Sequence, residues 1–357
     1  MSLRPENQHV RVLVVDDSAL MRSQIAGILN GDEQIEVIGQ AKDGQEALGL
    51  VSELKPDVVT LDVEMPKMNG ITALKHIMVR HPVPTIMISA LTQAGARTTF
   101  DALKYGAIDV LAKPSRRDDE SLEAQRDDII NKVKRAAAIR TGRSRYVRMG
   151  GPSTEHRKRG SGAPDSTTRF IGIGAGTGGF YSLLKIIPGI PVEFQDVLIA
   201  VILAARKYVE PFVSYLSDHS RIPVKSVRGA KTIEAGTCYV GSGQDKPRLF
   251  DTDGGAIECV LQEAGSGSDE KRGAVDMLLG SVAQVAGPMS VGVVLSGPGT
   301  DGAQGIHEIR SSGGVAVVQD INNCMDPSMP LAVLQKGTVE KMLPDYDMVE
   351  YLVNPDR

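Results

Sequence analysis

Cysteine is scarce in this chain, which excludes some kinds of stabilisation. Only three cysteines occur among 357 residues, namely Cys238, Cys259 and Cys324. They are odd in number, widely spaced and fit no metal-binding pattern, so we expect buried free thiols in a reducing compartment. A disulfide framework and a cysteine-ligated metal are both disfavoured.

Long apolar runs and a strong charge imbalance are also missing. The first ten residues, MSLRPENQHV, contain no apolar core of a signal peptide, and no apolar run reaches membrane-spanning length. The formal net charge is −4, so the overall charge does not indicate binding to nucleic acid or to a membrane surface. We therefore expect a cytoplasmic protein that neither inserts into a membrane nor binds nucleic acid.

The length and composition are those of two ordinary globular domains. Hydrophobic residues make up 41% and charged residues 24% of the chain. We expect a first domain over residues 1–140, a flexible linker over 141–167 and a second domain over 168–357. The linker is rich in glycine, serine, arginine and proline. We interpret its basic cluster as a solvated tether rather than an anion-binding surface, and this cluster comprises Arg143, Arg145, Arg148, Arg157, Lys158 and Arg159.

Strand and helix signals alternate in the first domain. VRVLVV is a short apolar run of the kind found in buried parallel strands, and apolar residues then recur at helical spacing over 18–29. The predicted strands are 10–15, 35–41, 57–63, 84–89 and 109–113. An amphipathic helix is predicted over 118–140, and its apolar stripe consists of Leu122, Ile129, Ile130 and Val133. This alternation predicts a doubly wound α/β fold with its site at the carboxyl ends of parallel strands.

Charged residues stand at these strand ends. Asp16 and Asp17 follow the first strand, Asp62 ends the third, and Lys113 ends the fifth. The carboxyl ends of an open parallel sheet converge on one crevice, where three carboxylates repel one another. A hard divalent cation such as Mg²⁺ relieves this repulsion and also neutralises an incoming phosphoryl group. Separate solvated acids would not explain why all of them stand at strand ends with a lysine opposite.

The segments VVDDSALMR, LDVEMPKMNG, MISAL and LAKPS occur in order and resemble the response-regulator receiver family over residues 10–140. The resemblance implies a flavodoxin-like domain that takes phosphate from a histidine kinase, with Asp62 as the acceptor. The implied Mg²⁺ ligands are Asp16, Asp17, Asp62 and the backbone carbonyl of Glu64. Ser89 is implied to contact the phosphoryl group after a conformational shift, and Lys113 to pair with it as a point charge.

Strand and helix signals resume at Arg169 and predict a second doubly wound parallel domain. The predicted strands are 170–175, 197–203, 237–241, 291–297 and 314–320. Helices are predicted between them, including 273–286 and 302–312.

The second domain carries GAGTGG directly after its first strand, followed by VDMLLGSVA, VGVVLSGPGTDGAQG and MPLAV. With the preceding domain and the basic linker, these segments resemble the chemotaxis protein-glutamate methylesterases of the CheB type over nearly the whole chain. The resemblance implies hydrolysis of glutamate methyl esters, and often deamidation of glutamines, on chemoreceptors. It implies a serine nucleophile, a histidine base, an orienting aspartate and backbone oxyanion donors, with no cofactor in this domain.

This chain departs from the implied pattern at several positions. Gly176 stands at the serine position, and the best register places Leu203 at the histidine, with no histidine between 157 and 218. Asp301 matches the aspartate, whereas Pro298 replaces a methionine in the oxyanion region and lacks an N–H. We therefore expect a pseudoenzyme that binds a chemoreceptor, a kinase or another component of the signalling array.

Two alternatives remain. One is an active methylesterase with a different nucleophile, for which Thr177 and Ser242 were considered. Thr177 points elsewhere on its turn, and neither His219 nor His307 stands at a strand end beside the glycine motif. The other is dinucleotide binding, because GAGTGG also satisfies G-x-G-x-x-G. The second strand, however, runs towards Arg206 without the expected terminal acid, and the family resemblance explains the same glycines better.

Overall fold

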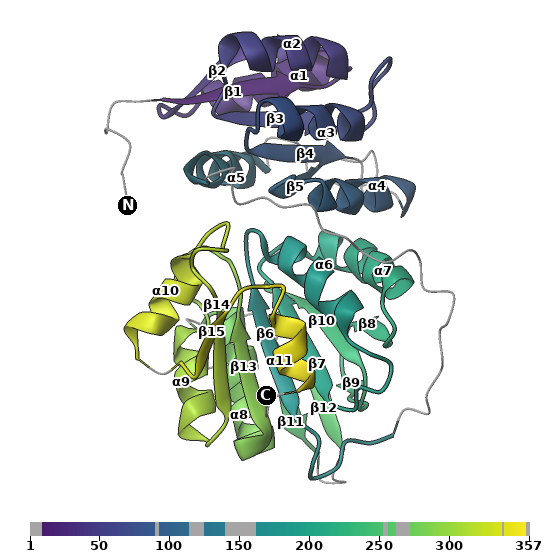
Figure 1. The fold of residues 1–357 in the computed structure, drawn as a ribbon, viewed down its shortest axis with the longest axis vertical. Coiled ribbons are helices and arrows are strands. Elements are labelled where there is room, and N and C mark those ends of the chain that lie inside the picture. The colour runs from purple at the N-terminus through teal and green to yellow at the C-terminus, as the bar shows by residue number, and fades with distance from the viewer. Residues whose placement is uncertain are drawn as a thin grey trace. The chain divides into compact units, whose positions relative to one another are not determined.

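The computed structural model divides into two compact units, residues 1–147 and 148–357, each built on a parallel sheet (Figure 1). It describes residues 9–89, 93–113, 125–139, 162–252, 256–261, 272–337 and 339–354. Most of the predicted linker, residues 141–161, lies outside these ranges.

The first unit contains a five-stranded parallel sheet in the order β2-β1-β3-β4-β5. Its strands are β1 (Val10–Val15), β2 (Ile35–Ala41), β3 (Val58–Asp62), β4 (Thr85–Ser89) and β5 (Asp109–Ala112). Its helices are α1 (Ala19–Asn30), α2 (Gly44–Leu54), α3 (Gly70–Arg80), α4 (Gln93–Lys104) and α5 (Arg126–Ala138). This strand order is that of flavodoxin-like folds and confirms the predicted fold class.

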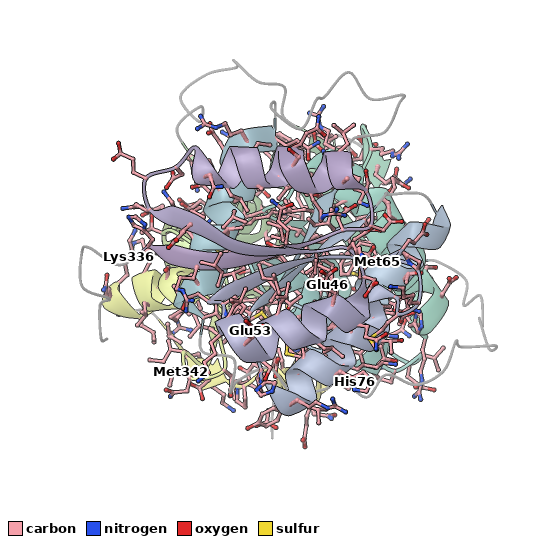
Figure 2. All side chains as sticks on the ribbon, turned by 90° about the horizontal axis from the view of Figure 1, so that it is seen from above. Glu46, Glu53, Met65, His76, Lys336 and Met342 are labelled. Atoms are coloured by element: carbon pink, nitrogen blue, oxygen red, sulfur yellow. The ribbon has the colours of Figure 1, made fainter. Side chains whose placement is uncertain are left out.

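Local signals explain where the helices begin. A side-chain oxygen just before each of α1, α2 and α3 accepts a hydrogen bond from a backbone N–H of the first turn, and the capping residues are Ser18, Asp43 and Asn69. The outer face of α2 is polar, with Glu46 and Glu53 exposed to solvent (Figure 2). The helices therefore bury one face and leave the other in water.

The last helix of the first unit is described only over the later part of its predicted range. Helix α5 begins at Arg126, whereas a helix from 118 was expected; residues 114–124, including Leu122, lie outside the described ranges. Ile129, Ile130 and Val133 are buried, as the predicted apolar stripe requires.

The second unit contains a seven-stranded sheet in the order β15-β14-β13-β6-β7-β10-β8, in which all pairings are parallel. Its strands are β6 (Phe170–Ala175), β7 (Val197–Ile202), β8 (Val224–Ser226), β10 (Cys238–Ser242), β13 (Ser290–Val294), β14 (Val315–Gln319) and β15 (Lys341–Leu343). This sheet confirms the second parallel α/β domain.

The second unit also contains helices, most of which contact this sheet. They are α6 (Gly179–Gly189), η3 (Arg206–Tyr208), α7 (Val209–His219), α8 (Ala274–Ala286), η4 (Gly287–Met289), α9 (Ala303–Ser311), α10 (Ser328–Gln335) and α11 (Met348–Val353). The alternate glycines of FIGIGA bring β6 close to α8. A Cβ atom at Gly172 would lie 2.7 Å from Leu279 Cδ2, and one at Gly174 only 2.1 Å from Val275 Cγ1. These glycines therefore serve close strand–helix packing.

A small antiparallel sheet was not predicted. It has the order β11-β12-β9 and consists of β9 (Lys231–Thr232), β11 (Pro247–Asp251) and β12 (Ile257–Leu261). Short strands of mixed polarity give weak periodic signals, which is also why β8 and β15 were missed. The predicted strands 197–203 and 291–297 end early, at Ile202 and Val294.

The three cysteines are buried free thiols, as predicted. Burial raises the pKa of Cys238 and of Cys259 to about 12, so neither is a reactive thiolate at neutral pH. Among the helices of the described residues, none combines the length and apolar character required to cross a bilayer.

Candidate functional site

Three carboxylates meet at the carboxyl edge of the first sheet. Asp16 follows β1 and Asp62 ends β3, and these two strands are paired neighbours. Oxygen atoms of Asp16, Asp17 and Asp62 lie within 4.8 Å of one another. Asp16 and Asp62 are buried and Asp17 is exposed, so the cluster opens to solvent on one side.

Lys113 lies directly against this cluster. Its Nζ is 2.8 Å from Asp16 Oδ2 and 2.7 Å from Asp62 Oδ2. The backbone N–H of Lys113 donates to the carbonyl of Ser89 over 2.8 Å, which places these two residues side by side at the ends of β4 and β5. The structure thus brings together the lysine and the acids that the sequence placed at strand ends.

The electrostatics of the cluster follow from burial and charge. Burial raises the pKa of Asp62 to about 6; Lys113 opposes this rise and the Asp16 charge adds to it. Burial alone would lower the pKa of Lys113, but its contacts with Asp16 and Asp62 outweigh that effect and leave the pKa raised. Lys113 is therefore a cation at neutral pH, and Asp62 is a carboxylate held in an unfavourable site.

The donor set fits a hard cation. Asp16 Oδ2 and Asp62 Oδ2 are fully buried and accept no hydrogen bond of good geometry among the described residues, although the Lys113 ammonium faces both. Buried carboxylate oxygens short of donors are suitable ligands for Mg²⁺. Glu64, predicted to contribute its carbonyl, is adjacent to the site, since its N–H lies 3.4 Å from Asp62 Oδ1.

Two further residues hold the acids in place and were missed by the sequence reasoning. Arg22 Nη1 donates to the carbonyls of Asp16 and Asp17 over 2.7 and 3.1 Å. Gly70 packs so tightly that a Cβ atom there would lie 1.9 Å from the Asp62 carbonyl oxygen. Arg22 lies in the segment VVDDSALMR and Gly70 in LDVEMPKMNG, so these two motifs could have identified them.

A cleft of about 900 Å³ opens over the cluster. Its lining includes Asp17, Asp62, Glu64, Ser89 and Lys113, together with Thr98 of α4. All the residues predicted to handle the phosphoryl group are therefore in or beside one solvent-accessible space.

The second unit places Gly176 and Leu203 next to each other. Gly176 follows β6 and Leu203 follows β7, and the N–H of Leu203 donates to the carbonyl of Ala175 over 2.7 Å. The side chain of Leu203 is partly buried over Gly243, where a Cβ atom would lie 2.8 Å from Leu203 Cδ2. The position implied for the base thus holds an apolar group that packs on the core.

The space beside Gly176 is filled by another loop. A Cβ atom at Gly176 would lie 2.7 Å from Gly297 Cα and 2.8 Å from Pro298 Cδ. The N–H of Gly176 also donates to the carbonyl of Ser296 over 2.8 Å. A serine at position 176 would therefore require the loop after β13 to move.

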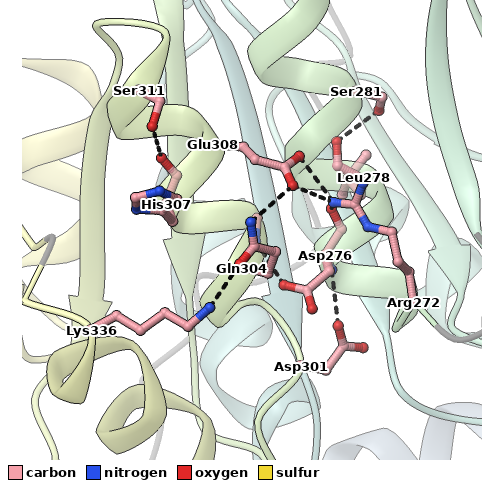
Figure 3. A network of polar contacts seen from close by, with 11 residues as sticks. Arg272, Asp276, Leu278, Ser281, Asp301, Gln304, His307, Glu308, Ser311 and Lys336 are labelled. Atoms are coloured by element: carbon pink, nitrogen blue, oxygen red, sulfur yellow. Dashed lines mark hydrogen bonds and ion pairs between the residues drawn. The ribbon is translucent and has the colours of Figure 1, made fainter.

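Asp301 has a structural role of its own. Its Oδ1 accepts a hydrogen bond from the N–H of Asp276 over 2.9 Å (Figure 3). Its Oδ2 accepts one from the N–H of Val275 over 3.1 Å. Helix α8 has Gly273 at its N-cap and no side-chain cap of its own. Asp301 supplies that missing cap from a distant loop.

A polar network continues from this cap across α8 and α9 (Figure 3). Arg272 Nη2 lies 2.9 Å from both carboxylate oxygens of Glu308, and Asp276 Oδ1 accepts from the N–H of Gly305 over 2.7 Å. Burial, with a contribution from the Asp301 charge, raises the pKa of Asp276 despite its backbone hydrogen bonds. The ring of His307 lies away from Asp301 in this view. The network joins two helices, and among the described residues no histidine side chain takes part in it.

The other candidate groups are also engaged or distant. Ser242 Oγ donates to the carbonyl of Ala204 over 2.7 Å, and Thr177 is buried. His219 ends α7, which starts near the carboxyl end of β7 and runs 11 residues, or about 16 Å, towards the opposite edge of the sheet. Arg206 is paired with Asp245. Within the described residues, no histidine stands beside Gly176 and no acidic residue ends β7. Neither the active methylesterase nor the dinucleotide-binding alternative therefore gains support.

Comparison with known proteins defines the class to which this architecture belongs. The family model of the response regulator receiver domain matches residues 12–125, and that of the CheB methylesterase matches residues 171–352. The crystal structure of the Thermotoga maritima CheB methylesterase catalytic domain is similar, with a TM-score of 0.50 and 26% identity over 53% of this chain and 98% of that one. The chain is a receiver domain joined to a methylesterase-type domain.

Full-length relatives identify the family. A protein from Pyrococcus abyssi named protein-glutamate methylesterase/protein-glutamine glutaminase is 40% identical over 94% of this chain and 90% of its own length. A Vibrio vulnificus protein of the same name, numbered 2, is 34% identical over 97% and 98% of the two chains. The chain belongs to the CheB family of protein-glutamate methylesterases.

Proposed function

We propose that this protein is a phosphorylation-controlled response regulator of a chemotaxis-type two-component system, with an output domain that binds a partner without hydrolysing esters. Asp62 accepts the phosphoryl group from a histidine kinase. The partner is a chemoreceptor or another component of the signalling array, and the setting is the cytoplasm. The proposed phosphorylation at Asp62 rests on the contact of Lys113 with both Asp16 and Asp62 at the edge of the first sheet.

The chemistry of the receiver site supports the role of each residue. Mg²⁺ held by Asp16, Asp17, Asp62 and the Glu64 carbonyl would neutralise charge around the acceptor. Lys113 is positioned to pair with a phosphoryl oxygen, since its ammonium already lies 2.7 Å from Asp62. Ser89 is buried beside Lys113, where its hydroxyl would contact the phosphoryl group after a local shift.

The proposal of a non-hydrolytic output rests on the groups at the second edge. Gly176 offers no nucleophile, Leu203 offers no proton acceptor, and Pro298 offers no backbone donor. Asp301, the one matching group, is explained by its two hydrogen bonds to the start of α8. Losing single members of such a triad costs on the order of 10⁴ to 10⁶ in kcat, and here two are missing.

The alternative is an active methylesterase that uses a different nucleophile, as the names of its relatives would suggest. It is disfavoured because Ser242 Oγ already donates to a backbone carbonyl and because no described histidine lies at this edge.

Methanol release separates the two functions. Methylated chemoreceptor is incubated with the protein before and after phosphorylation by a small phosphodonor in Mg²⁺. We expect no methanol in either state, and capture of the receptor or of an array protein in at least one. Methanol production that disappears in Asp301→Ala would establish the enzymatic alternative and overturn the proposal.

A further inference from the structure

A polar groove lies at the same edge of the second sheet as Gly176 and Leu203, further towards the β8 end. It has a volume of about 800 Å³ and is lined by segments that follow three neighbouring strands. Arg206 follows β7, Gln244 follows β10, and Arg228 follows β8. Because β7, β10 and β8 are adjacent and parallel, their carboxyl ends build one continuous surface.

Two arginines present unused donors in this groove. Arg206 donates through Nε to Asp245, and Arg228 Nε lies 2.6 Å from Glu210 Oε1. Their Nη1 and Nη2 nitrogens have no hydrogen-bond partner among the described residues, and the two side chains are 71% and 72% exposed. Each guanidinium is thus anchored by Nε and keeps its outer nitrogens available to a ligand.

The anchoring acids fix these arginines in position. Asp245 is buried, with only 9% of its side chain exposed, and the Arg206 N–H donates to Gln244 Oε1 over 3.2 Å. Glu210 Oε1 is shared between Arg228 and the hydroxyl of Ser226. The arginines therefore lose less conformational freedom on binding than unpaired surface arginines would.

The charge of the groove indicates the kind of ligand. Among the described lining residues, Arg206, Lys207 and Arg228 carry three positive charges and Glu210 and Asp245 two negative charges, a formal sum of +1. So small a positive charge is poorly suited to binding a chain of phosphate groups, which Glu210 and Asp245 would repel. The groove is better suited to a protein partner with two separate carboxylates, one for the guanidinium of Arg206 and one for that of Arg228. Polar and apolar residues of the partner would lie between these carboxylates.

We propose that this groove is a docking site for an acidic protein segment, whose glutamate or aspartate side chains bind the outer nitrogens of Arg206 and Arg228. Of its apolar lining residues, Val209 and Val227 are buried and Leu261 is partly exposed, so Leu261 is the apolar residue that contacts the aliphatic part of the same segment. The inference deepens the proposed binding output and rests on it, because it assigns that output to a defined surface.

The probe is a fluorescein-labelled helical peptide with glutamates along one face, and its reference peptide has glutamine at those positions. Binding to the full-length protein is followed by fluorescence anisotropy at low and at moderate salt. We expect the glutamate peptide to bind more tightly than the glutamine peptide, and its affinity to fall by about tenfold in Arg206→Gln/Arg228→Gln. Arg228→Lys keeps the positive charge but loses the paired N–H donors of the guanidinium. We therefore expect this variant to bind the glutamate peptide with intermediate affinity.

Arg221→Gln is the matched control, because Arg221 is exposed on the same unit but lines a separate pocket near the starts of β7 and β8. It should leave peptide binding unchanged. Arg206→Gln leaves the buried Asp245 unpaired, so Arg228→Gln alone decides the question if the double variant fails to fold. Equal affinity of both peptides, loss of affinity in Arg221→Gln, or full affinity in Arg228→Gln would each overturn the inference. Anionic vesicles or inorganic phosphate that displace the peptide equally well would do the same.

Methanol release measured on the same samples keeps the two proposals apart. Methanol production with arginine-dependent peptide binding overturns the proposed non-hydrolytic output and supports the docking site. Absence of methanol with arginine-independent binding overturns the docking site alone.

Discussion

The carboxyl edges of the two parallel sheets use their polar groups differently. At the first edge, two buried carboxylate oxygens without good hydrogen bonds face a single ammonium. At the second edge, the carboxylate of Asp301 accepts two backbone hydrogen bonds, and the space beside Gly176 is filled by Gly297 and Pro298. The first edge therefore keeps a cluster of ionised groups within reach of solvent, whereas at the second edge the Asp301 carboxylate is engaged by backbone N–H groups.

The largest expected effect concerns the first edge. Asp62→Asn should abolish Mg²⁺-dependent phosphate uptake from a small phosphodonor, because the neutral amide cannot act as the acceptor. Radiolabel incorporation measures this directly. Glu53→Gln, an exposed change on α2, is the control and should label normally. Equal labelling of Asp62→Asn would place the acceptor elsewhere.

The second edge is tested by rebuilding its missing groups. Gly176→Ser alone should release no methanol from methylated receptor, because the new Cβ meets Gly297 and Pro298 and no base stands at Leu203. Gly176→Ser/Leu203→His/Pro298→Gly removes the contact with the Pro298 ring, leaves the contact with Gly297 Cα, and restores a hydroxyl, an imidazole and an N–H. We expect detectable turnover only in this triple variant. Turnover in the single variant would show that neither the contact with the loop after β13 nor the missing base at position 203 prevents hydrolysis.

A smaller effect tests why Asp301 is present. Asp301→Ala removes both acceptors at the start of α8 and should lower the free energy of unfolding by about 1–2 kcal/mol. Urea denaturation measures the change. Asp301→Asn keeps one acceptor and should cost less, while the exposed Asp251→Ala should cost nearly nothing. An unchanged stability in Asp301→Ala would contradict the capping role.

The smallest effect is a pH dependence at the first edge, measured in metal-free protein. The pKa of Asp62 is raised from 3.8 to about 6, so the folded state binds this proton more tightly than the unfolded state. Its contribution to stability is therefore complete below the lower value and is lost as the pH rises through the higher one. At pH 7 the ionised group costs on the order of 1 kcal/mol relative to the protonated group.

Asp62→Asn removes that cost. We expect it to raise the free energy of unfolding by about 1 kcal/mol at pH 7 and to give no gain at pH 4. Urea titrations with a chelator at both pH values provide the test. A gain of equal size at both values would mean that packing, and not ionisation, is responsible.

The parts predicted from the sequence depend on regular parallel strands. Continuous apolar runs located β1, β3 and β6, and the convergence of parallel strand ends brought Asp16, Asp62 and Lys113 into one cluster. The same regularity placed Leu203 beside Gly176, since the strands before them are paired. Where the sheet geometry is regular, a position in the sequence fixes a position in space.

The parts that were missed depend on contacts across irregular loops. The hydrogen bonds of Asp301 reach α8 over 25 and 26 residues of sequence, and the closure beside Gly176 depends on the path of the loop after β13. Neither the hydrogen bonds of Asp301 nor the path of this loop is marked by a repeating pattern of apolar residues in the sequence. The groove of Arg206 and Arg228 was missed for the same reason, because its lining comes from the ends of three strands, one of which, β8, has only three residues.

The outermost strands of the seven-stranded sheet have a consequence for solubility. Strands β15 and β8 have three residues each, and they carry Lys341 and Lys225. An exposed edge of unpaired backbone groups is a template on which a second chain can add a strand, and short lysine-bearing edges oppose that addition. This sheet therefore ends on both sides in strands that discourage edge-to-edge aggregation.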